Sequence, residues 1–228
     1  MKKNYHIFIF SKSWIGSGMA NIGQTLNMAQ HFSNHFETSI FLRGVIKNNK
    51  LIAERILGQS PRFNIEINNK NIVFHLISCF KKIFSKPKTN VIFFSRNVPA
   101  CMALSLFGYR SILELHQDNF NRYKTIDYLL GKLFKISLFK NKIKIVVISE
   151  SLKKIICLKF KLKNDIYVSH DASNLPNDDL LKLRKRNRKL IVYTGKLGDD
   201  RSVNHILDIA KHDTNSDFRI IGGTLEQV

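Results

Sequence analysis

Cysteine is scarce in this chain, which has three cysteines among its 228 residues. Cys79, Cys101 and Cys157 are odd in number and widely spaced, and each lies in an apolar run. A disulfide framework or a zinc site would need cysteines in even number or at short, regular spacing. The sequence therefore argues against both and predicts buried free thiols in a reducing compartment.

Long hydrophobic runs are also missing. The longest one, from Val91 to Phe107, contains Arg96, Asn97 and Pro99, so it does not fit a membrane-spanning helix. The apolar run in the N-terminal "MKKNYHIFIF" is too short for a signal peptide and leads straight into "SKSW". We expect a cytoplasmic protein, either free or peripheral on the inner face of the membrane.

Acidic residues are few: 17 Asp and Glu stand against 37 Lys and Arg, which gives a net charge of +20 at pH 7. The surplus is concentrated at residues 122–163, where 12 basic residues face 2 acidic ones. Such a basic band favours an anionic partner, which can be membrane lipid, a diphosphate or nucleic acid. The alternative is that these lysines only keep the surface solvated, since Lys, Asn and Ile are abundant throughout the chain.

Short apolar runs alternate with longer segments of helical periodicity, a pattern typical of a parallel α/β sheet. Several runs are apolar nearly throughout, as strands covered on both faces should be. Strands are predicted at 5–10, 38–42, 91–94, 111–115, 143–148, 166–168, 190–194 and 218–221. Helices are predicted from residue 19 onward and at 100–107, 126–139, 150–160 and 202–211, with a helix, a strand and a helix within 46–88.

One segment interrupts this alternation. Residues 171–189, "DASNLPNDDLLKLRKRNRK", combine a proline, polar turn residues and a charge run. We interpret the segment as a linker between an N-terminal Rossmann-like domain, residues 1–170, and an incomplete C-terminal domain, residues 190–228. The predicted fold class is therefore α/β, with one complete parallel-sheet domain followed by the beginning of a second.

A glycine-containing turn follows the first predicted strand, in "SKSWIGSGMANIG". Gly16, Ser17 and Gly18 would let the backbone approach a ligand at a helix N-terminus. The spacing departs from the dinucleotide fingerprint G-x-G-x-x-G, and the second strand ends in "FLRG" without the acidic residue that holds a ribose. Nicotinamide binding is therefore disfavoured, and a glycine-rich connector without a ligand remains an alternative.

Polar residues also follow other predicted strands. Glu114 and His116 end the strand in "SILELHQ", and Arg96 follows "VIFF". In open parallel sheets this edge faces the ligand crevice, where His116 could touch a sugar hydroxyl or a phosphate. A lone histidine is more often structural. Ser149, after "IKIVVI", is expected to cap the next helix.

The stretch "YTGKLGDDRS" places two cations around a turn between a strand and a helix. Gly195 ends the strand, and Lys196 and Arg201 flank the helix start. Two cations beside a helix N-terminus suit a multiply charged anion such as a diphosphate. Two solvated surface charges would give the same spacing.

This stretch resembles the G-R-L-x-x-x-K-G element that opens the C-terminal domain of group 1 (family 4) glycosyltransferases of the GT-B fold. In that family the arginine and the lysine hold the diphosphate of a nucleotide-sugar donor. Lys196 stands at the arginine position, Arg201 at the lysine position and Ser202 at the final glycine. Charge is kept at both sites, but lysine lacks the bidentate fork of arginine, so a weaker grip on the phosphates is expected.

The resemblance continues along nearly the whole chain. "GSGMANIGQTLNMAQHF" is similar to the first glycine loop and helix of the family, and "ILELHQ" resembles a strand-end segment with a histidine at the cleft. "IVVISESLKKII" and "RIIGG" are similar to later segments, in the family's order. The later E-x(7)-E carboxylates of the family have no counterpart before Val228. We therefore expect a truncated chain or a fragment.

The resemblance implies a retaining, metal-independent glycosyltransferase. Its co-substrate would be a nucleotide-diphosphate sugar, without a further cofactor, and its acceptor a glycan or a lipid-linked hydroxyl in bacterial surface polysaccharide synthesis, such as capsule or lipopolysaccharide. His116 would orient the reacting sugar as the catalytic residue. Gly195, Lys196 and Arg201 would bind the diphosphate, and the turn at residues 16–18 would line the cleft. Truncation would weaken or abolish catalysis.

A second hypothesis is a basic nucleic-acid-binding α/β protein without enzymatic activity. The basic residues are not interleaved with a recognisable reading motif, such as a zinc finger or an aromatic platform, so no specific nucleic acid is expected. A third, an oxidoreductase built on the first glycine turn, predicts nicotinamide binding.

Overall fold

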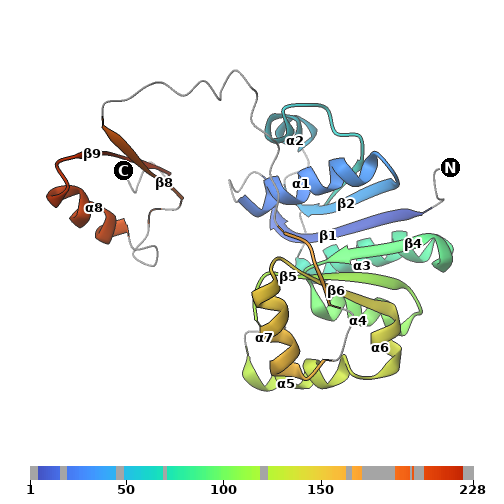
Figure 1. The fold of residues 1–228 in the computed structure, drawn as a ribbon. Helices are drawn as coiled ribbons and strands as arrows, with labels where there is room; N and C mark the ends of the chain where they lie inside the picture. The colour runs from blue at the N-terminus through green and yellow to red at the C-terminus, as the bar shows by residue number, and fades with distance from the viewer. Residues whose placement is uncertain are drawn as a thin grey trace. The chain divides into compact units, whose positions relative to one another are not determined.

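A computed structural model describes residues 5–15, 20–44, 49–68, 71–118, 123–162, 166–170, 188–195, 197 and 203–222. The chain divides into two compact units, unit 1 from Met1 to Ser173 and unit 2 from Asn174 to Val228 (Figure 1).

Unit 1 is built on a seven-stranded sheet in which all paired strands are parallel. The strands are β1 (His6–Trp14), β2 (Glu37–Arg43), β3 (Asn64–Asn68), β4 (Val91–Ser95), β5 (Arg110–Leu115), β6 (Ile143–Val147) and β7 (Ile166–Val168). Their order in space is β3-β2-β1-β4-β5-β6-β7. The chain thus winds outward from β1 in one direction and then from β4 in the other, and the strand order reverses between these two strands.

Helices cover both faces of the sheet (Figure 1). They are α1 (Ala20–Ser33), α2 (Asn49–Leu57), α3 (Ile72–Phe84), α4 (Val98–Leu106), α5 (Lys124–Leu133), α6 (Ser137–Lys142) and α7 (Glu150–Phe160), with a short 3₁₀ turn η1 (Lys88–Asn90) before β4. Helices α1 and α2 share a core with one face, and α3 to α7 share a second core with the other.

Strand β1 shows why the sequence produces two cores. Its residues alternate between the two faces, so Ile7 and Ile9 pack into the core of α1 and α2. Phe8 and Phe10 pack into the core of α3 to α7. Because both faces are covered, the strand is apolar throughout this stretch.

Helices α5 and α7 approach each other closely at a glycine. A Cβ atom added to Gly131 would lie 2.1 Å from Cδ1 of the buried Phe160. Beside this contact, Lys159 Nζ lies 2.9 Å from Oδ2 of the buried Asp127 and donates a hydrogen bond of 2.8 Å to the carbonyl oxygen of Asp118. One lysine of α7 therefore joins α5 to the segment that follows β5.

Unit 2, where described, is a parallel pair of strands, β8 (Lys189–Thr194) and β9 (Ser216–Ile221), with the helix α8 (Val203–His212) between them in sequence. At the carboxyl end of the pair, the Gly195 amide donates to the Ile221 carbonyl oxygen at 3.0 Å. Gly222 has φ +142°, and a Cβ atom there would lie 1.8 Å from the Gly195 oxygen. Only glycine lets the two backbones come this close.

The predicted alternation of strands and helices is confirmed, including the helix, strand and helix within 46–88. Two details of the first turn were wrong. The segment "SKSW" belongs to β1, which pairs Trp14 with Arg43 beyond an irregularity. Gly23 lies inside α1 rather than in the turn.

The single helix expected at 126–139 was also wrong, because two helices occupy this region. Helix α5 ends at Leu133, and the backbone is extended at Ile136 before α6 begins. Phe134, between the two helices, and Phe139, within α6, are both buried in the core. Burial of these two rings favours a break over a continuous helix.

The cysteines are free thiols, as expected. Cys79 and Cys101 are fully buried, and burial raises the pKa of both thiols. Among the described helices, none combines the length and the apolar character needed to cross a membrane.

The contact at Gly131 gives a stability test. Gly131→Ala should destabilise the fold by about 1–3 kcal/mol, since the new methyl group overlaps a buried ring that has no room to move. Gly23→Ala is the matched control, because its Cβ would lie 3.7 Å from Ile56 Cγ2, an ordinary contact. The control should be neutral or up to about 1 kcal/mol more stable. Urea unfolding of both variants measures the effect, and equal stabilities would contradict the packing described for α5 and α7.

Candidate functional site

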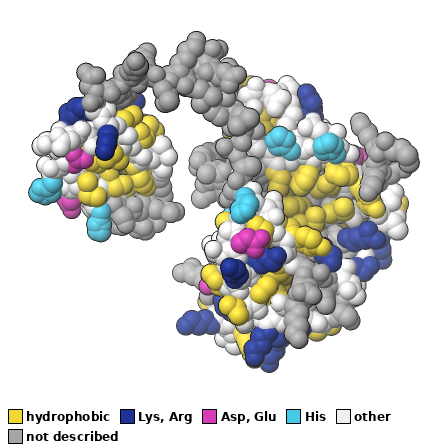
Figure 2. All heavy atoms as spheres, in the orientation of Figure 1, with side chains coloured by type: hydrophobic (Ala, Val, Ile, Leu, Met, Phe, Trp, Pro, Cys, Tyr) yellow, Lys and Arg dark blue, Asp and Glu magenta, His cyan; other side chains and the backbone are white. Residues whose placement is uncertain are grey.

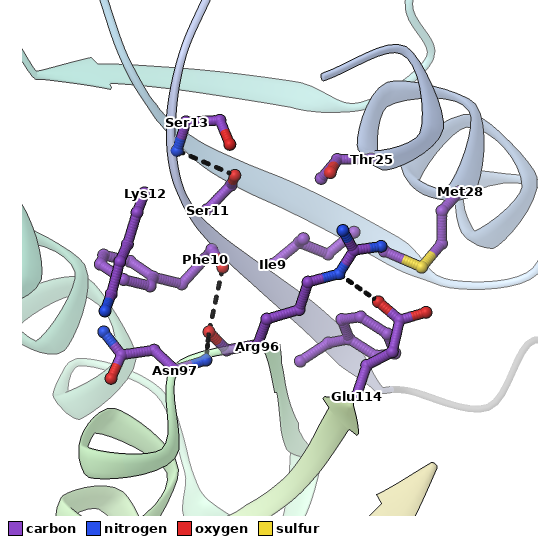
Figure 3. A pocket seen from close by; sticks show the side chains of 12 residues that line it. Ile9, Phe10, Ser11, Lys12, Ser13, Thr25, Met28, Arg96, Asn97 and Glu114 are labelled. Atoms are coloured by element: carbon purple, nitrogen blue, oxygen red, sulfur yellow. Dashed lines mark hydrogen bonds and ion pairs between the residues drawn. The ribbon is translucent and has the colours of Figure 1, made fainter. Parts of the chain in front are cut away.

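A pocket of about 200 Å³ opens at the carboxyl edge of the sheet in unit 1. Its lining comes from the ends of β1, β4 and β5, together with Thr25 and Met28 of α1 (Figure 3). The pocket thus lies where the strand order reverses between β1 and β4. In open α/β sheets, this reversal point is where ligands bind.

Hydrogen bonds fix the end of β4 against the end of β1. Ser95 Oγ donates to the Phe10 carbonyl oxygen at 3.0 Å and accepts from the Asn97 amide at 3.0 Å. The Asn97 side chain then accepts from the Ala100 amide at 3.2 Å and caps α4. This chain of bonds holds the pocket floor in place and directs the first turn of α4 away from it.

Arg96 and Glu114 form an ion pair at the pocket. Arg96 Nε lies 2.7 Å from Glu114 Oε2, and Arg96 Nη2 donates to Gln24 Oε1 of α1 at 2.8 Å. Figure 3 shows the guanidinium group reaching from the end of β4 toward Glu114 at the end of β5. Arg96 therefore links two strand ends to the helix that forms the opposite wall.

His116 lies next to the same carboxylate. Its Nε2 is 3.4 Å from Glu114 Oε2, an ion-pair contact that is longer than an ordinary hydrogen bond. This nitrogen is buried and makes no hydrogen bond within the described part of the chain.

Burial alone would raise the pKa of Glu114. The contacts with His116 and with the Arg96 guanidinium outweigh burial and lower the pKa below its ordinary value. The carboxylate is therefore ionised at neutral pH, although only 8% of the residue is exposed.

A buried histidine contacts two of the residues that line the pocket. His75 of α3 stacks on Phe10, with ring centroids 4.8 Å apart, and its Nε2 lies 3.3 Å from the Ser11 carbonyl oxygen. Burial lowers the pKa of His75, so the ring is neutral near pH 7. It holds the strand end in place without adding charge to the pocket.

The pocket can bind a polar or anionic ligand. Lys12 is exposed at its rim, and the charge of Arg96 is matched by Glu114, which leaves a positive balance. His116 lies beside the lining residue Glu114, and its buried Nε2 faces that carboxylate. No group of three or more His, Cys, Asp or Glu side chains that could hold a metal ion occurs among the residues with described positions.

The sequence-predicted site residues fall into three groups. His116 follows β5 as expected, beside Glu114 and Arg96. Gly195 follows β8 in unit 2, where it pairs with the end of β9. Lys196, Arg201 and the turn of Gly16, Ser17 and Gly18 lie outside the described residues, so their predicted roles stay predictions.

Sequence reasoning missed three polar residues of the site. Gln24 holds the Arg96 guanidinium, while Ser95 and Asn97 tie the strand end to α4. The stretch "SRNVP" did contain a signal, because asparagine followed by a proline two residues later is typical of a helix start. Gln24 carries no such signal, since its role depends on how α1 lies against β4.

The chain matches no family model and no curated protein sequence. Solved structures do resemble it. Alr3699/HepE of Anabaena in complex with UDP has a TM-score of 0.64 at 12% identity over 97% of this chain and 61% of that one. A glycosyltransferase of Rickettsia africae ESF-5 has a TM-score of 0.61 at 16% identity over 95% of this chain and 59% of that one.

The lipopolysaccharide outer core galactosyltransferase WaaB, in its apo form, has a TM-score of 0.53 at 15% identity over 97% of this chain and 62% of that one. The chain therefore spans about three fifths of the length of the structures it resembles. These likenesses confirm the expected fold class, an α/β architecture of the GT-B type.

The ion pair at the pocket predicts a pH dependence. Because the pKa of Glu114 is lower in the folded state, the ionised carboxylate stabilises the fold above its unfolded pKa, and this stabilisation is lost as the pH falls through the folded value. In Glu114→Gln this loss should vanish, so below about pH 4.5 its free energy of unfolding should decline less steeply than that of the wild type.

Urea titrations from neutral to acidic pH measure the two slopes. Arg96→Met is the companion variant: it removes a cation that lowers the folded-state pKa of Glu114, so the loss of stability on acidification should be smaller than in the wild type. Parallel curves for all three proteins would contradict the ion pair.

Proposed function

We propose that this chain is a GT-B glycosyltransferase of the group 1 (family 4) type, which transfers a sugar from a nucleotide-diphosphate donor to a hydroxyl acceptor. The observation that carries the proposal is the pocket at the point of strand reversal, which Arg96 and the ionised Glu114 line, with His116 next to that carboxylate. Support comes from the fold, since the neighbours include one protein, Alr3699/HepE of Anabaena, that was solved with UDP and with UDP-glucose.

The donor diphosphate is assigned to Lys196 and Arg201, beside the backbone of Gly195. As the bond between sugar and phosphate breaks, negative charge grows on the leaving diphosphate, and fixed cations stabilise it there. By the family resemblance, Gly16, Ser17 and Gly18 would line the cleft. The family resemblance implies that the anomeric configuration is retained and that no metal ion takes part.

His116 is the proposed catalytic residue, and it orients the sugar. The contact of its Nε2 with Glu114 fixes the ring at the end of β5, beside the pocket. Arg96 and Gln24 in turn hold Glu114 in position. Such a fixed set of groups can contribute to catalysis by positioning alone.

The acceptor is proposed to be a glycan or a lipid-linked hydroxyl in bacterial surface polysaccharide synthesis, as in capsule or lipopolysaccharide. The basic band at 122–163 would hold the enzyme at the cytoplasmic face of the membrane. Lys and Arg side chains are visible at the lower end of unit 1, where α5 lies (Figure 2). Lys124, Lys132 and Lys135 are exposed there.

A basic nucleic-acid-binding protein without enzymatic activity is the alternative. The net charge of +20 favours it, since any duplex would bind in a salt-dependent way. Binding to duplex DNA therefore does not discriminate between the two proposed functions. Saturable binding of a nucleoside diphosphate does, because it would favour the glycosyltransferase.

The affinity for UDP, measured by calorimetry, tests the donor site. Lys196→Ala and Arg201→Ala should each weaken UDP binding about tenfold or more, since each removes a charge-assisted contact to phosphate. Lys211→Ala is the matched control: it removes one lysine from unit 2 whose side chain is 71% exposed and paired with Asp208. Equal UDP affinity in the wild type and in all variants would contradict the diphosphate site proposed at Lys196 and Arg201.

His116 can be tested by turnover. His116→Ala should lower the release of UDP from a panel of UDP-sugars about a hundredfold, while the affinity for UDP itself stays within about twofold. His170→Ala, in the same unit, is the control, because its ring contacts only the Ile148 carbonyl oxygen among the hydrogen bonds of the described residues. Unchanged release of UDP in His116→Ala would show that His116 takes no part in the reaction.

A further inference from the structure

Arg43 ends β2 in a position that its neighbours fix. It pairs with Trp14 of β1 on one side and with Asn68 of β3 on the other. The Ile15 amide donates to its carbonyl oxygen at 2.7 Å. The backbone of Arg43 is thus held from both sides at the carboxyl edge of the sheet, which is the edge where open α/β sheets bind ligands.

The side chain of Arg43 lies on the α3 side of the sheet. Successive residues of a strand alternate between its faces, and Phe41, two positions earlier, packs into the core of α3 to α7. The guanidinium carbon of Arg43 lies over the ring of Trp14, 5.5 Å from its centroid. An aromatic ring attracts a cation placed over its face, so Trp14 helps to fix the position of the charge.

The charge of Arg43 has no carboxylate partner within the described part of the chain. Its Nε is buried there and makes no hydrogen bond. The acidic residue of β3, Glu66, pairs with Lys82 of α3 instead. Charged groups that are partly withdrawn from water are normally paired, because their desolvation is costly. A buried polar atom without a partner therefore points to a ligand or an ion that completes the site.

The nearby histidine does not supply the missing negative charge. Burial is the main reason why the pKa of His75 is lowered, and the charge of Arg43 lowers it further. The ring is therefore neutral, and the positive charge of Arg43 acts on this end of the sheet without compensation from α3.

Arg43 and Trp14 adjoin the pocket along β1 without lining it. Ser11, Lys12 and Ser13 line the pocket, and Trp14 is the next residue of the strand. The pairing of β1 with β2 is irregular between Phe10 and Trp14. Irregularities of this kind beside a site redirect side chains. They separate the residues that face the pocket from the pair formed by Trp14 and Arg43.

We infer that Arg43, held by Trp14, is a subsite for an oxyanion, either a carboxylate or a phosphate, on the part of the acceptor that extends beyond the pocket. A guanidinium group offers paired N–H donors that match these anions and that a neutral hydroxyl does not fill. Because Nε is shielded, the contact falls to Nη1 and Nη2. The assignment to the acceptor rests on the proposed sugar transfer, whereas the anion subsite itself does not. The enzyme would thus select an acidic or phosphorylated acceptor over a neutral one.

Trp14 provides the measurement, because it is the only tryptophan of the chain and contacts Arg43. Its fluorescence is titrated in the full chain with inorganic phosphate, glucuronate and glucose at constant ionic strength. Phosphate and glucuronate should each change the emission saturably. Glucose carries a hydroxymethyl group in place of the carboxylate and should not. The tighter of the two anions shows whether the subsite prefers a phosphate or a carboxylate.

Two variants of Arg43 test its role. Arg43→Met removes the charge and should weaken the binding of both anions about tenfold or more. Arg43→Lys keeps the charge but loses the fork, so its affinity should lie between those of the wild type and Arg43→Met. Thermal unfolding checks that the variants fold, and Arg43→Lys carries the comparison if Arg43→Met does not.

The matched control is Arg110→Met. Arg110 is exposed at the first residue of β5, so this variant removes the same charge at the amino edge of the same sheet. Its affinity for both anions should stay within about twofold of the wild type, because the remaining charges are screened at this distance.

Three results would overturn the inference. The first is the absence of a saturable response to either anion. The second is equal anion affinity in the wild type and in both Arg43 variants, which would place the anions elsewhere on the basic surface. The third is glucose binding as tight as that of glucuronate.

The affinity for UDP, measured by calorimetry on the same proteins, separates this inference from the proposed function. Arg43→Met should bind UDP within about twofold of the wild type, and a larger loss would assign Arg43 to the donor instead of the acceptor. A failure of the donor site at Lys196 and Arg201 would appear in the UDP affinity and leave the response of Trp14 to phosphate and glucuronate unchanged.

Discussion

The reversal of strand order between β1 and β4 is the constraint on which the site depends. Both faces of the central strands are covered, so polar side chains can project only where the strands end. Because all the paired strands are parallel, those ends meet at one edge. The hydrogen bond from Ser95 Oγ to the Phe10 carbonyl oxygen joins the two halves of the sheet at that edge. The pocket, the ion pair and His116 are all placed by this arrangement.

The fold was largely predictable because its signals are local. Strands that are buried on both faces are apolar runs, and the helices between them carry their own periodicity, as with Ile22, Leu26 and Ala29 in α1. Ser149 was expected as a cap and accepts from the Leu152 amide. The break between α5 and α6 was missed because no proline or glycine lies between Leu133 and Ser137. It follows from the burial of Phe134, which depends on neighbours far away in the sequence.

The candidate site was predictable only in part. His116, Glu114 and Arg96 could each be placed at a strand end, since that follows from the position of each strand. The contacts among these three side chains could not be predicted from the sequence. They require β4 and β5 to be adjacent and in register, with Ser95 opposite Leu113. Gln24 shows the limit most clearly: an ordinary helical glutamine becomes part of the site only through the packing of α1.

Lys159 has a consequence for how the site responds to a ligand. It holds Asp127 of α5 and the carbonyl oxygen of Asp118, two residues after His116. A ligand that displaced this segment would have to break the hydrogen bond from Lys159 Nζ to the Asp118 carbonyl oxygen. The segment that follows His116 is thus held to α7 by the ammonium group of Lys159, which favours a preorganised site over one that closes upon its substrate.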